Sequence, residues 1–261
     1  MLKKFKENKQ LSKELAKFIV KKINKKKNFN IGCPGGRSLK KTYKYIGYYS
    51  YKMNIDLNNV KIFMMDEYVI KTKNNRYKLC NQKDHFSCVR YSYKVIQKLF
   101  NYKKTKNKLI KENIFFPKVE NVKNYDNLIK KMGGIDIFLL ASGSTDGHVA
   151  FNNFKSKKNS ITHITKLSKE TRTDNLKTFP KFKSLKEVPK YGVTVGLGTI
   201  RKLSKKAILV LSGKEKRDAT KIILRKKYFN KNWPSTIIYE CKKNDIYIDM
   251  NALNIKWQNI L

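Results

Sequence analysis

Two side chains that can carry protons or charge follow an apolar segment in the middle of the chain. Asp146 and His148 stand in the stretch 140–154, directly after the apolar run 135–140 and beside several small residues. Ligands of open α/β sheets bind at the carboxyl ends of buried strands, which is where this pair is expected. An imidazole also changes its charge near neutral pH. A turn in which Asp146 caps a helix and His148 stays at the surface explains the same residues, so other parts of the chain must decide.

A second acidic pair follows another apolar run. Asp66 and Glu67 come directly after 60–65, which is predicted to be a buried strand. Carboxylates at the end of a buried strand are costly unless they are solvated, paired or used in chemistry. The pair therefore marks either a solvated strand end or helix cap, or a second part of a functional site.

Two further segments have the composition of anion sites. Gly35, Gly36, Arg37 and Ser38 lie between a predicted strand at 28–33 and a predicted helix that begins near Leu39. Free N–H groups and the positive end of a helix dipole attract anions at such a turn. The segment 212–217 places Lys214 and Lys216 before another helix, in a similar setting. An ordinary tight turn and two solvated lysines remain the alternatives. Neither segment matches the ATP-binding P-loop or the dinucleotide fingerprint, so neither ATP nor a nicotinamide cofactor is inferred, and no metal site is expected.

The elements that must position these residues alternate between strands and helices. Apolar runs predict strands at 28–33, 60–65, 135–140, 191–200, 206–211 and 245–249, with a short extended piece at 113–117 and a short helix or strand at 235–240. Helical spacing appears at 11–25, from Leu39, at 89–100, at 125–132 and from 217 to about 226. The alternation predicts an α/β fold with a mostly parallel sheet. Polar loops are expected at 71–83 and at 155–190, and the latter is predicted to form a lid over a ligand.

Size and charge restrict the class of protein. The 261 residues suit one domain spanning 1–261, and the net charge of +41 comes almost wholly from lysines dispersed along the chain. Nucleic-acid binders gather charge on one face and favour arginine, so solvated lysines are favoured over a nucleic-acid surface.

Four cysteines without paired spacing predict free thiols. No signal peptide and no apolar run of about 18 residues is present, so we expect a cytoplasmic protein without membrane attachment.

Taken in order, these motifs resemble the glucosamine-6-phosphate deaminase family, whose scaffold is shared by 6-phosphogluconolactonases. The resemblance rests on GCPGGRS at 32–38, MDEY at 65–68, DGHVAFN at 146–152, YGVTVGLG at 191–198 and LSGKEK at 211–216. It implies a modified Rossmann-like α/β fold, with helices on both faces of the sheet and no nicotinamide cofactor. The implied reaction converts an amino-sugar 6-phosphate to fructose 6-phosphate and ammonia. A lactonase, another sugar-phosphate isomerase and a non-catalytic sugar-phosphate sensor are the alternatives.

The resemblance also implies roles for individual residues. Asp66 corresponds to the general base that moves a proton between the first two sugar carbons. His148 corresponds to the residue that assists ring opening, with Asp146 orienting it. Gly35, Gly36 and Ser38 match the phosphate loop and Lys216 matches a phosphate-binding lysine, while Arg37 and Glu67 are expected among the substrate contacts. Lys177 aligns with an arginine of the lid that reaches the phosphate, and it keeps the charge but not the bidentate geometry.

Three further positions depart from the pattern of the family. Asn153 stands where deaminases carry a glutamate that completes an acidic pair around the histidine. If that carboxylate raises the basicity of the imidazole, Asn153 should weaken ring opening, and Asn153→Glu should raise turnover. Gly35 and Arg37 replace a common Thr and Gly, so Arg37 is expected either to add a phosphate contact or to indicate another substrate. The family includes monomers and hexamers, so a homo-oligomer is compatible with the sequence.

Overall fold

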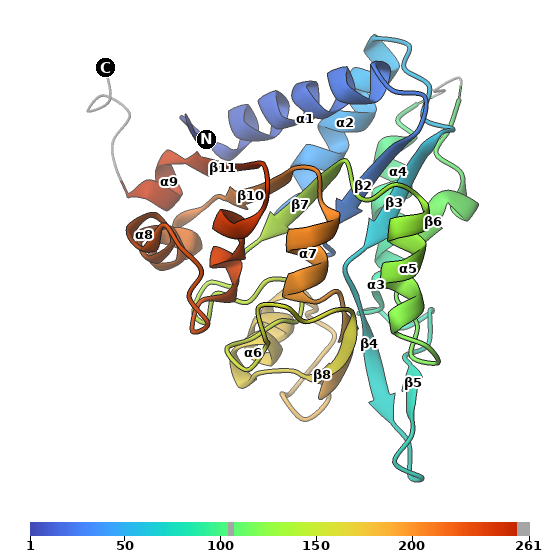
Figure 1. The fold of residues 1–261 in the computed structure, drawn as a ribbon, viewed down its shortest axis with the longest axis vertical. Helices are drawn as coiled ribbons and strands as arrows, with labels where there is room; N and C mark the ends of the chain where they lie inside the picture. Colours follow the sequence, from blue (N-terminus) through green and yellow to red (C-terminus); the bar gives the residue numbers. More distant parts are fainter. Residues whose placement is uncertain (104–106, 255–261) are drawn as a thin grey trace.

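The main sheet of the molecule contains seven parallel strands (Figure 1). Its order is β1 (Leu2–Phe5), β11 (Asn244–Asp249), β10 (Ala207–Leu211), β7 (Ile137–Ala141), β2 (Phe29–Cys33), β3 (Val60–Met64) and β6 (Ile114–Phe115). Every pair of neighbours is parallel, which confirms the predicted parallel sheet. The computed structural model describes residues 1–103 and 107–254, so the remainder of the predicted 1–261 domain lies outside the described residues.

Helices cover both faces of this sheet, as predicted. One face carries α1 (Asn8–Asn24), α2 (Lys40–Lys52), α3 (Cys88–Tyr91), a π-helical turn (Ser92–Gln97) and α4 (Lys98–Phe100). The other carries α5 (Lys123–Lys131), α7 (Leu197–Leu203), α8 (Arg217–Lys226), α9 (Met250–Leu253) and a 3-10 helix (Pro234–Glu240). Successive residues of β7 point to opposite faces, so Leu139 joins one apolar cluster while Phe138 and Leu140 join the other.

A second, antiparallel sheet of four strands was not predicted. It contains β5 (Tyr77–Leu79), β4 (Asp66–Lys71), β9 (Tyr191–Thr194) and β8 (His163–Lys166). The chain passes from β3 into β4 with only Met65 between them, and β4 leaves the main sheet toward the bottom of Figure 1. Asp66 and Glu67 are therefore the first residues of a strand rather than a strand end, and the loop expected at 71–83 contains β5.

Two further expectations about the second half of the chain were incomplete. The polar segment 155–190 contains β8 and α6 (Lys169–Thr178). The strand expected at 191–200 ends at Thr194, and α7 begins at Leu197. Gly196 lies between them, and a Cβ atom there would approach the carbonyl oxygens of Ser160 and Ile161 to 2.1 and 2.4 Å. The backbone must therefore turn at a residue without a side chain.

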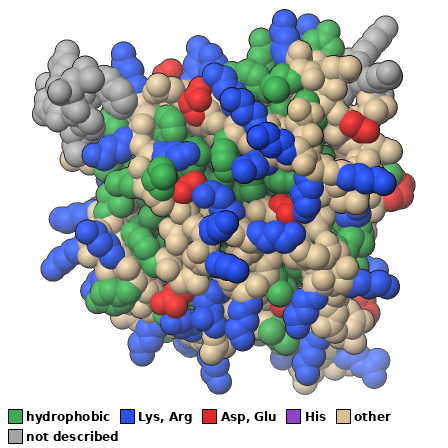
Figure 2. Space-filling view, turned by 45° about the horizontal axis from the view of Figure 1, so that its top comes forward, with side chains coloured by type: hydrophobic (Ala, Val, Ile, Leu, Met, Phe, Trp, Pro, Cys, Tyr) green, Lys and Arg blue, Asp and Glu red, His purple; other side chains and the backbone are tan. Residues whose placement is uncertain are grey.

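Lysine and arginine side chains are spread over the surface rather than gathered in one patch on the face drawn in Figure 2. Apolar side chains lie between them across the same face. All four cysteines are free, as predicted, and all four are buried. Among the described residues, no helix combines the length and the apolar character needed to cross a lipid bilayer.

Candidate active site

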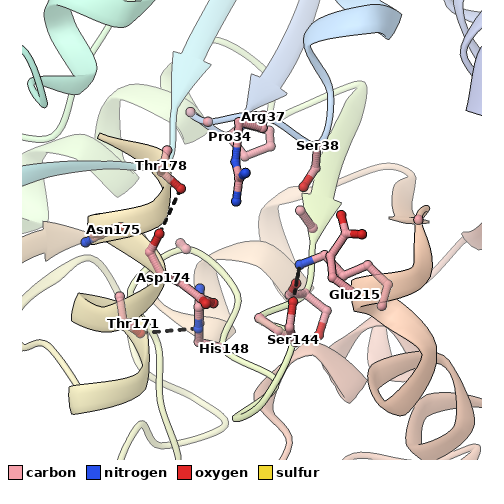
Figure 3. A pocket seen from close by; sticks show the side chains of 18 of the residues that line it. Pro34, Arg37, Ser38, Ser144, His148, Thr171, Asp174, Asn175, Thr178 and Glu215 are labelled. Carbon is pink, nitrogen blue, oxygen red and sulfur yellow. Dashed lines mark hydrogen bonds between the residues drawn. The ribbon is translucent and has the colours of Figure 1, made fainter. Parts of the chain in front are cut away.

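A cavity of about 470 Å³ opens beside the carboxyl ends of β2, β7 and β10. Its wall is formed by the loops that follow these strands, by the start of β4 and by α6 (Figure 3). The predicted residues that line it are Gly35, Gly36, Arg37, Ser38, Asp66, His148 and Lys216. The sheet thus brings together residues that are up to 181 positions apart in sequence, from Gly35 to Lys216.

The glycine loop after β2 is held by two tyrosines. The Tyr43 hydroxyl donates to the carbonyl oxygen of Pro34 at 2.8 Å, and the Tyr91 hydroxyl donates to that of Gly36. Gly36 has a φ of +87°, which glycine adopts without strain. Because the carbonyls are engaged by tyrosines and the N–H groups of residues 35–38 have no acceptor in the described chain, the loop offers donors to an anion. Helix α2 begins at Lys40, so Ser38 precedes it.

Lys216 supplies a cation to the same cavity. Its ammonium donates to the carbonyl oxygen of Ser142 at 2.8 Å and to the Ser144 hydroxyl at 3.0 Å. Burial lowers the pKa of Lys216, while the carboxylates of Asp174 and Glu215 act against this shift. These contacts hold the charge of Lys216 near the loop that follows β7, at the wall of the cavity.

Asp146 and His148 form a connected pair. Asp146 Oδ1 lies 2.6 Å from His148 Nδ1, and Asp146 Oδ2 accepts a hydrogen bond from Ser168 at 2.9 Å. The Thr171 hydroxyl lies 3.2 Å from the same imidazole nitrogen. Burial disfavours the charge of Asp146, but the hydrogen bonds from His148 and Ser168 outweigh it and lower the Asp146 pKa to about 2. An ionised Asp146 fixes the proton of the neutral imidazole on Nδ1, which leaves Nε2 as the nitrogen available to a ligand.

Gly143 allows this pair to pack closely. A Cβ atom at Gly143 would approach Nδ1 of His148 to 2.3 Å and Oδ1 of Asp146 to 2.4 Å. Its N–H donates to the carbonyl oxygen of His148 at 2.7 Å. The small residue noted after the apolar run therefore serves packing against the pair.

Asp66 lines the cavity in a buried position, with 7% of its surface exposed. Burial raises the pKa of Asp66 to about 7. The Cys88 thiol donates a hydrogen bond to Oδ1 at 3.4 Å and opposes the shift, the nearby Glu67 carboxylate adds to it, and His148 opposes it. Asp66 can therefore both accept and return a proton near neutral pH.

Glu67 does not line the cavity, so the prediction that it contacts substrate was wrong for this structure. Its carboxylate accepts hydrogen bonds from the N–H groups of Cys88 at 2.9 Å and Val89 at 2.8 Å, and from the Ser87 hydroxyl at 2.7 Å. A carboxylate at the first turn of a helix satisfies N–H groups that lack partners within the helix. Glu67 therefore fixes the start of α3, which carries Cys88 beneath Asp66.

Asn153 and Lys177 also lie away from the cavity. Asn153 is buried; its Nδ2 donates to the carbonyl oxygen of Lys166 at 3.2 Å and its Oδ1 accepts from the N–H of Lys155 at 3.0 Å. None of its hydrogen bonds reaches His148. Lys177 is exposed on α6 and is not part of the cavity wall, which corrects its expected place beside the phosphate.

Sequence reasoning missed the residues that α6 turns toward the cavity. These are Thr171, Asp174, Asn175 and Thr178, and their spacing of three and four residues is that of one helix face. Ser168 accepts a hydrogen bond from the Thr171 N–H at 3.0 Å and starts the helix. A serine followed by an acidic residue of the first turn, Glu170, was the available signal for this start. Leu176 is the one large apolar residue of the helix, so no apolar stripe indicated which side faces inward.

Comparisons with known proteins find relatives over most of the chain. A sequence profile of glucosamine-6-phosphate isomerases/6-phosphogluconolactonase matches residues 6–248. A glucosamine-6-phosphate deaminase from Thermoanaerobacter sp. is 31% identical over 252 residues, which cover 94% of this chain and 91% of the relative. One from Mycoplasma mycoides subsp. mycoides is 31% identical and covers 93% of this chain and 92% of its own.

Solved structures show the same fold. A monomeric glucosamine-6-phosphate deaminase superposes with a TM-score of 0.82 at 24% identity, over 97% of this chain and 98% of the other. A 6-phosphogluconolactonase from Plasmodium vivax superposes with a TM-score of 0.64 at 22% identity, over 95% of this chain and 89% of the other. The parallel sheet and its second, antiparallel sheet therefore belong to a scaffold that is found with both activities.

Proposed function

The chain belongs to the family of glucosamine-6-phosphate isomerases and 6-phosphogluconolactonases, and we propose that it converts glucosamine 6-phosphate and water to fructose 6-phosphate and ammonia. The observation that carries the proposal is the meeting of Asp66, the Asp146–His148 pair and the glycine loop with Lys216 in one cavity. The relatives at 31% identity over most of the chain support the deaminase reaction over others on this scaffold.

The substrate binds with its phosphate at the glycine loop and Lys216. The N–H groups of residues 35–38 donate to phosphate oxygens, and the ammonium of Lys216 neutralises part of their charge. Arg37, which is exposed at the rim, adds a second cation. The segment 155–190 is the lid of this site, because α6 supplies one wall of the cavity.

His148 catalyses the opening of the sugar ring. Nε2 of the neutral imidazole takes the proton of the C1 hydroxyl and delivers it to the ring oxygen as the C1–O5 bond breaks. Asp146 holds the ring and stabilises the imidazolium that forms in between, since its own pKa of about 2 keeps it ionised. Thr171 on α6 contacts the other imidazole nitrogen, Nδ1, from the lid side.

Asp66 catalyses the isomerisation of the open-chain sugar. Its ionised carboxylate takes the hydrogen of C2 as a proton from the open-chain amino aldehyde. The resulting carboxylic acid returns this proton to C1, while one proton of the C2 amino group passes to the C1 oxygen. This leaves an imine at C2, and water adds to that carbon and displaces ammonia, which gives fructose 6-phosphate. A carboxyl pKa of about 7 suits a group that must accept and then donate a proton at neutral pH.

The test is the stoichiometry of the products. Purified protein is incubated with glucosamine 6-phosphate, and ammonia and fructose 6-phosphate are measured together; we expect equal amounts. Asp66→Asn should abolish both, whereas Asp56→Asn, which changes an exposed acid outside the cavity wall, should leave them unchanged. No ammonia from the wild type, or the wild-type rate from Asp66→Asn, would contradict the proposal. Hydrolysis of 6-phosphogluconolactone without ammonia release would instead identify a lactonase.

A further inference from the structure

The cavity contains an acid that the proposed reaction does not use. Asp174 lies on the inward face of α6, one helical turn after Thr171, whose hydroxyl contacts His148 at 3.2 Å. Figure 3 shows Asp174 and Thr171 on the α6 wall, across the cavity from Ser38 and Glu215. Its backbone carbonyl accepts a hydrogen bond from Thr178 at 2.9 Å, so the residue is held within the helix.

The carboxylate of Asp174 has no partner in the described chain. No hydrogen bond or ion pair reaches it, whereas the carboxylate of Asp146 bonds to His148 and Ser168 and that of Asp66 bonds to Cys88. The charge of Asp174 acts to raise the pKa of the nearby Lys216, but the Lys216 ammonium donates its hydrogen bonds to Ser142 and Ser144. Asp174 therefore lines the cavity as a negative charge that the protein does not neutralise by contact.

An unpaired carboxylate opposes the binding of a purely anionic ligand. A phosphate dianion at residues 35–38 and Lys216 would meet repulsion from Asp174, as it would from any like charge in a partly desolvated cavity. The repulsion becomes an attraction if the ligand carries a positive charge at its other end. A sugar phosphate with an ammonium group has this distribution of charge, and one with only hydroxyl groups does not.

We infer that Asp174 is a specificity-determining residue that binds the C2 ammonium group of an amino-sugar 6-phosphate. The inference rests on the proposed function for the placement of the sugar: Asp66 must face the C2 hydrogen and His148 must reach C1 and the ring oxygen. In this placement we assign the nitrogen substituent of C2 to the wall that carries Thr171 and Asp174. An ammonium group at C2 also makes the C2 hydrogen more acidic, so a carboxylate that stabilises it assists the step at Asp66.

The size of the effect follows from the type of contact. A charge-assisted hydrogen bond in a partly buried site contributes roughly 10- to 100-fold in affinity. A neutral hydroxyl in place of the ammonium can also donate to Asp174, but it offers no opposite charge. The protein should therefore prefer the amino ligand by about tenfold or more, and this preference should depend on the charge of Asp174.

The test uses two open-chain ligands that can neither close a ring nor isomerise. The binding of 2-amino-2-deoxyglucitol 6-phosphate and of glucitol 6-phosphate is measured by calorimetry at pH 7 with the full chain. For the wild type we expect the amino ligand to bind about tenfold or more tightly than the hydroxyl ligand. In Asp174→Asn the amino ligand should lose this advantage, while the hydroxyl ligand binds equally well or better. Asp174→Glu keeps the charge and should restore part of the preference.

A matched control separates recognition from overall charge. Glu215 also lines the cavity, and Glu215→Gln removes one negative charge from the wall opposite α6; this change should alter both affinities alike. The inference fails if Asp174→Asn changes both ligands alike, if the preference persists without the carboxylate, or if the wild type shows no preference or does not bind the amino ligand.

Binding and turnover keep the two proposals distinguishable. A wild type that shows an Asp174-dependent preference but releases no ammonia would overturn the proposed reaction and leave the ammonium site in place. A wild type that releases ammonia while Asp174→Asn keeps the full preference would overturn only the role of Asp174.

Discussion

Replacement of Cys88 by alanine should shift the pH dependence of the reaction. The Cys88 thiol, 3.4 Å from Oδ1, is the hydrogen-bond donor to the Asp66 carboxylate in the described chain. Burial raises the Asp66 pKa to about 7, and the hydrogen bond from the thiol acts in the opposite direction. The other charged groups that act on Asp66 are Glu67, which raises its pKa, and His148, which lowers it. Removal of the thiol should therefore raise the Asp66 pKa further.

The magnitude follows from the strength of this hydrogen bond. A hydrogen bond to a charged group contributes about 1.5–3 kcal/mol, and a thiol is a weaker donor, so we take about 1 kcal/mol, or roughly 0.7 pKa unit. From a pKa of about 7, this shift lowers the ionised fraction of Asp66 at pH 6 from about 9% to about 2%. Activity at pH 6 should fall about fivefold, and activity at pH 9 should stay almost unchanged.

The assay is the profile of kcat/KM for ammonia release between pH 5.5 and 9.5. Cys88→Ala should move the acid limb to higher pH, and Cys88→Ser, which keeps a donor, should leave the limb in place or move it to lower pH. Cys241→Ala removes a buried free thiol that is outside the cavity wall and serves as the control. Ionisations of the substrate are common to all four proteins. A uniform loss of activity in Cys88→Ala with an unmoved limb, or the same shift in Cys88→Ser, would refute the assigned contact.

The remaining predictions concern stability, phosphate binding and Asn153. Burial raises the Asp66 pKa from 3.8 to about 7, so ionisation of Asp66 destabilises the folded protein as pH rises between these values. Asp66→Asn should therefore be more stable than the wild type above pH 7, by about 2–4 kcal/mol in the free energy of unfolding measured by chemical denaturation. This gain should be absent near pH 4. Tyr91→Phe removes the donor to the carbonyl of Gly36 and should raise KM for the sugar phosphate severalfold while kcat changes little; an unchanged KM would speak against the role of Tyr91 in holding the loop. Asn153→Glu should not raise turnover, contrary to the expectation from sequence, because Asn153 does not contact His148. Loss of the hydrogen bond to the carbonyl oxygen of Lys166 should lower the free energy of unfolding by about 1 kcal/mol. A higher turnover would show that the glutamate reaches the imidazole.

The central strands β7 and β10 of the parallel sheet were predictable because they are continuous apolar runs, whereas the edge strand β1 contains Lys3 and Lys4 and was not predicted. The segments 207–211 and 137–140 are buried on both faces, and such strands are recognised without alternation. The second sheet was missed because its strands are short and half exposed: β5 and β8 have no fully buried residue. Their pairing with β4 and β9 depends on contacts between distant segments, which local periodicity does not encode.

The site was predictable in its elements and less so in the direction of individual side chains. Adjacent residues of a strand point to opposite faces, so Asp66 faces the cavity and Glu67 faces α3; nothing in the acidic pair itself distinguishes them. On α6, Lys177 and Asp174 are three residues apart on a helix without an apolar stripe. Which of them faces the ligand is decided by the bonds of Ser168 and Thr171 to Asp146 and His148, which only the folded chain brings together.

The role of Asp66 in moving the C2 hydrogen can be measured by isotope transfer. Glucosamine 6-phosphate labelled with deuterium at C2 is incubated with the wild type, and the label is followed by nuclear magnetic resonance. The wild type should move the label from C2 to C1 of fructose 6-phosphate or to water, and the label should slow the reaction. Asp66→Asn, folded as judged by its thermal unfolding, should leave the label at C2 of unreacted substrate. Movement of the label by Asp66→Asn at the wild-type rate would contradict the assignment of Asp66 as the base.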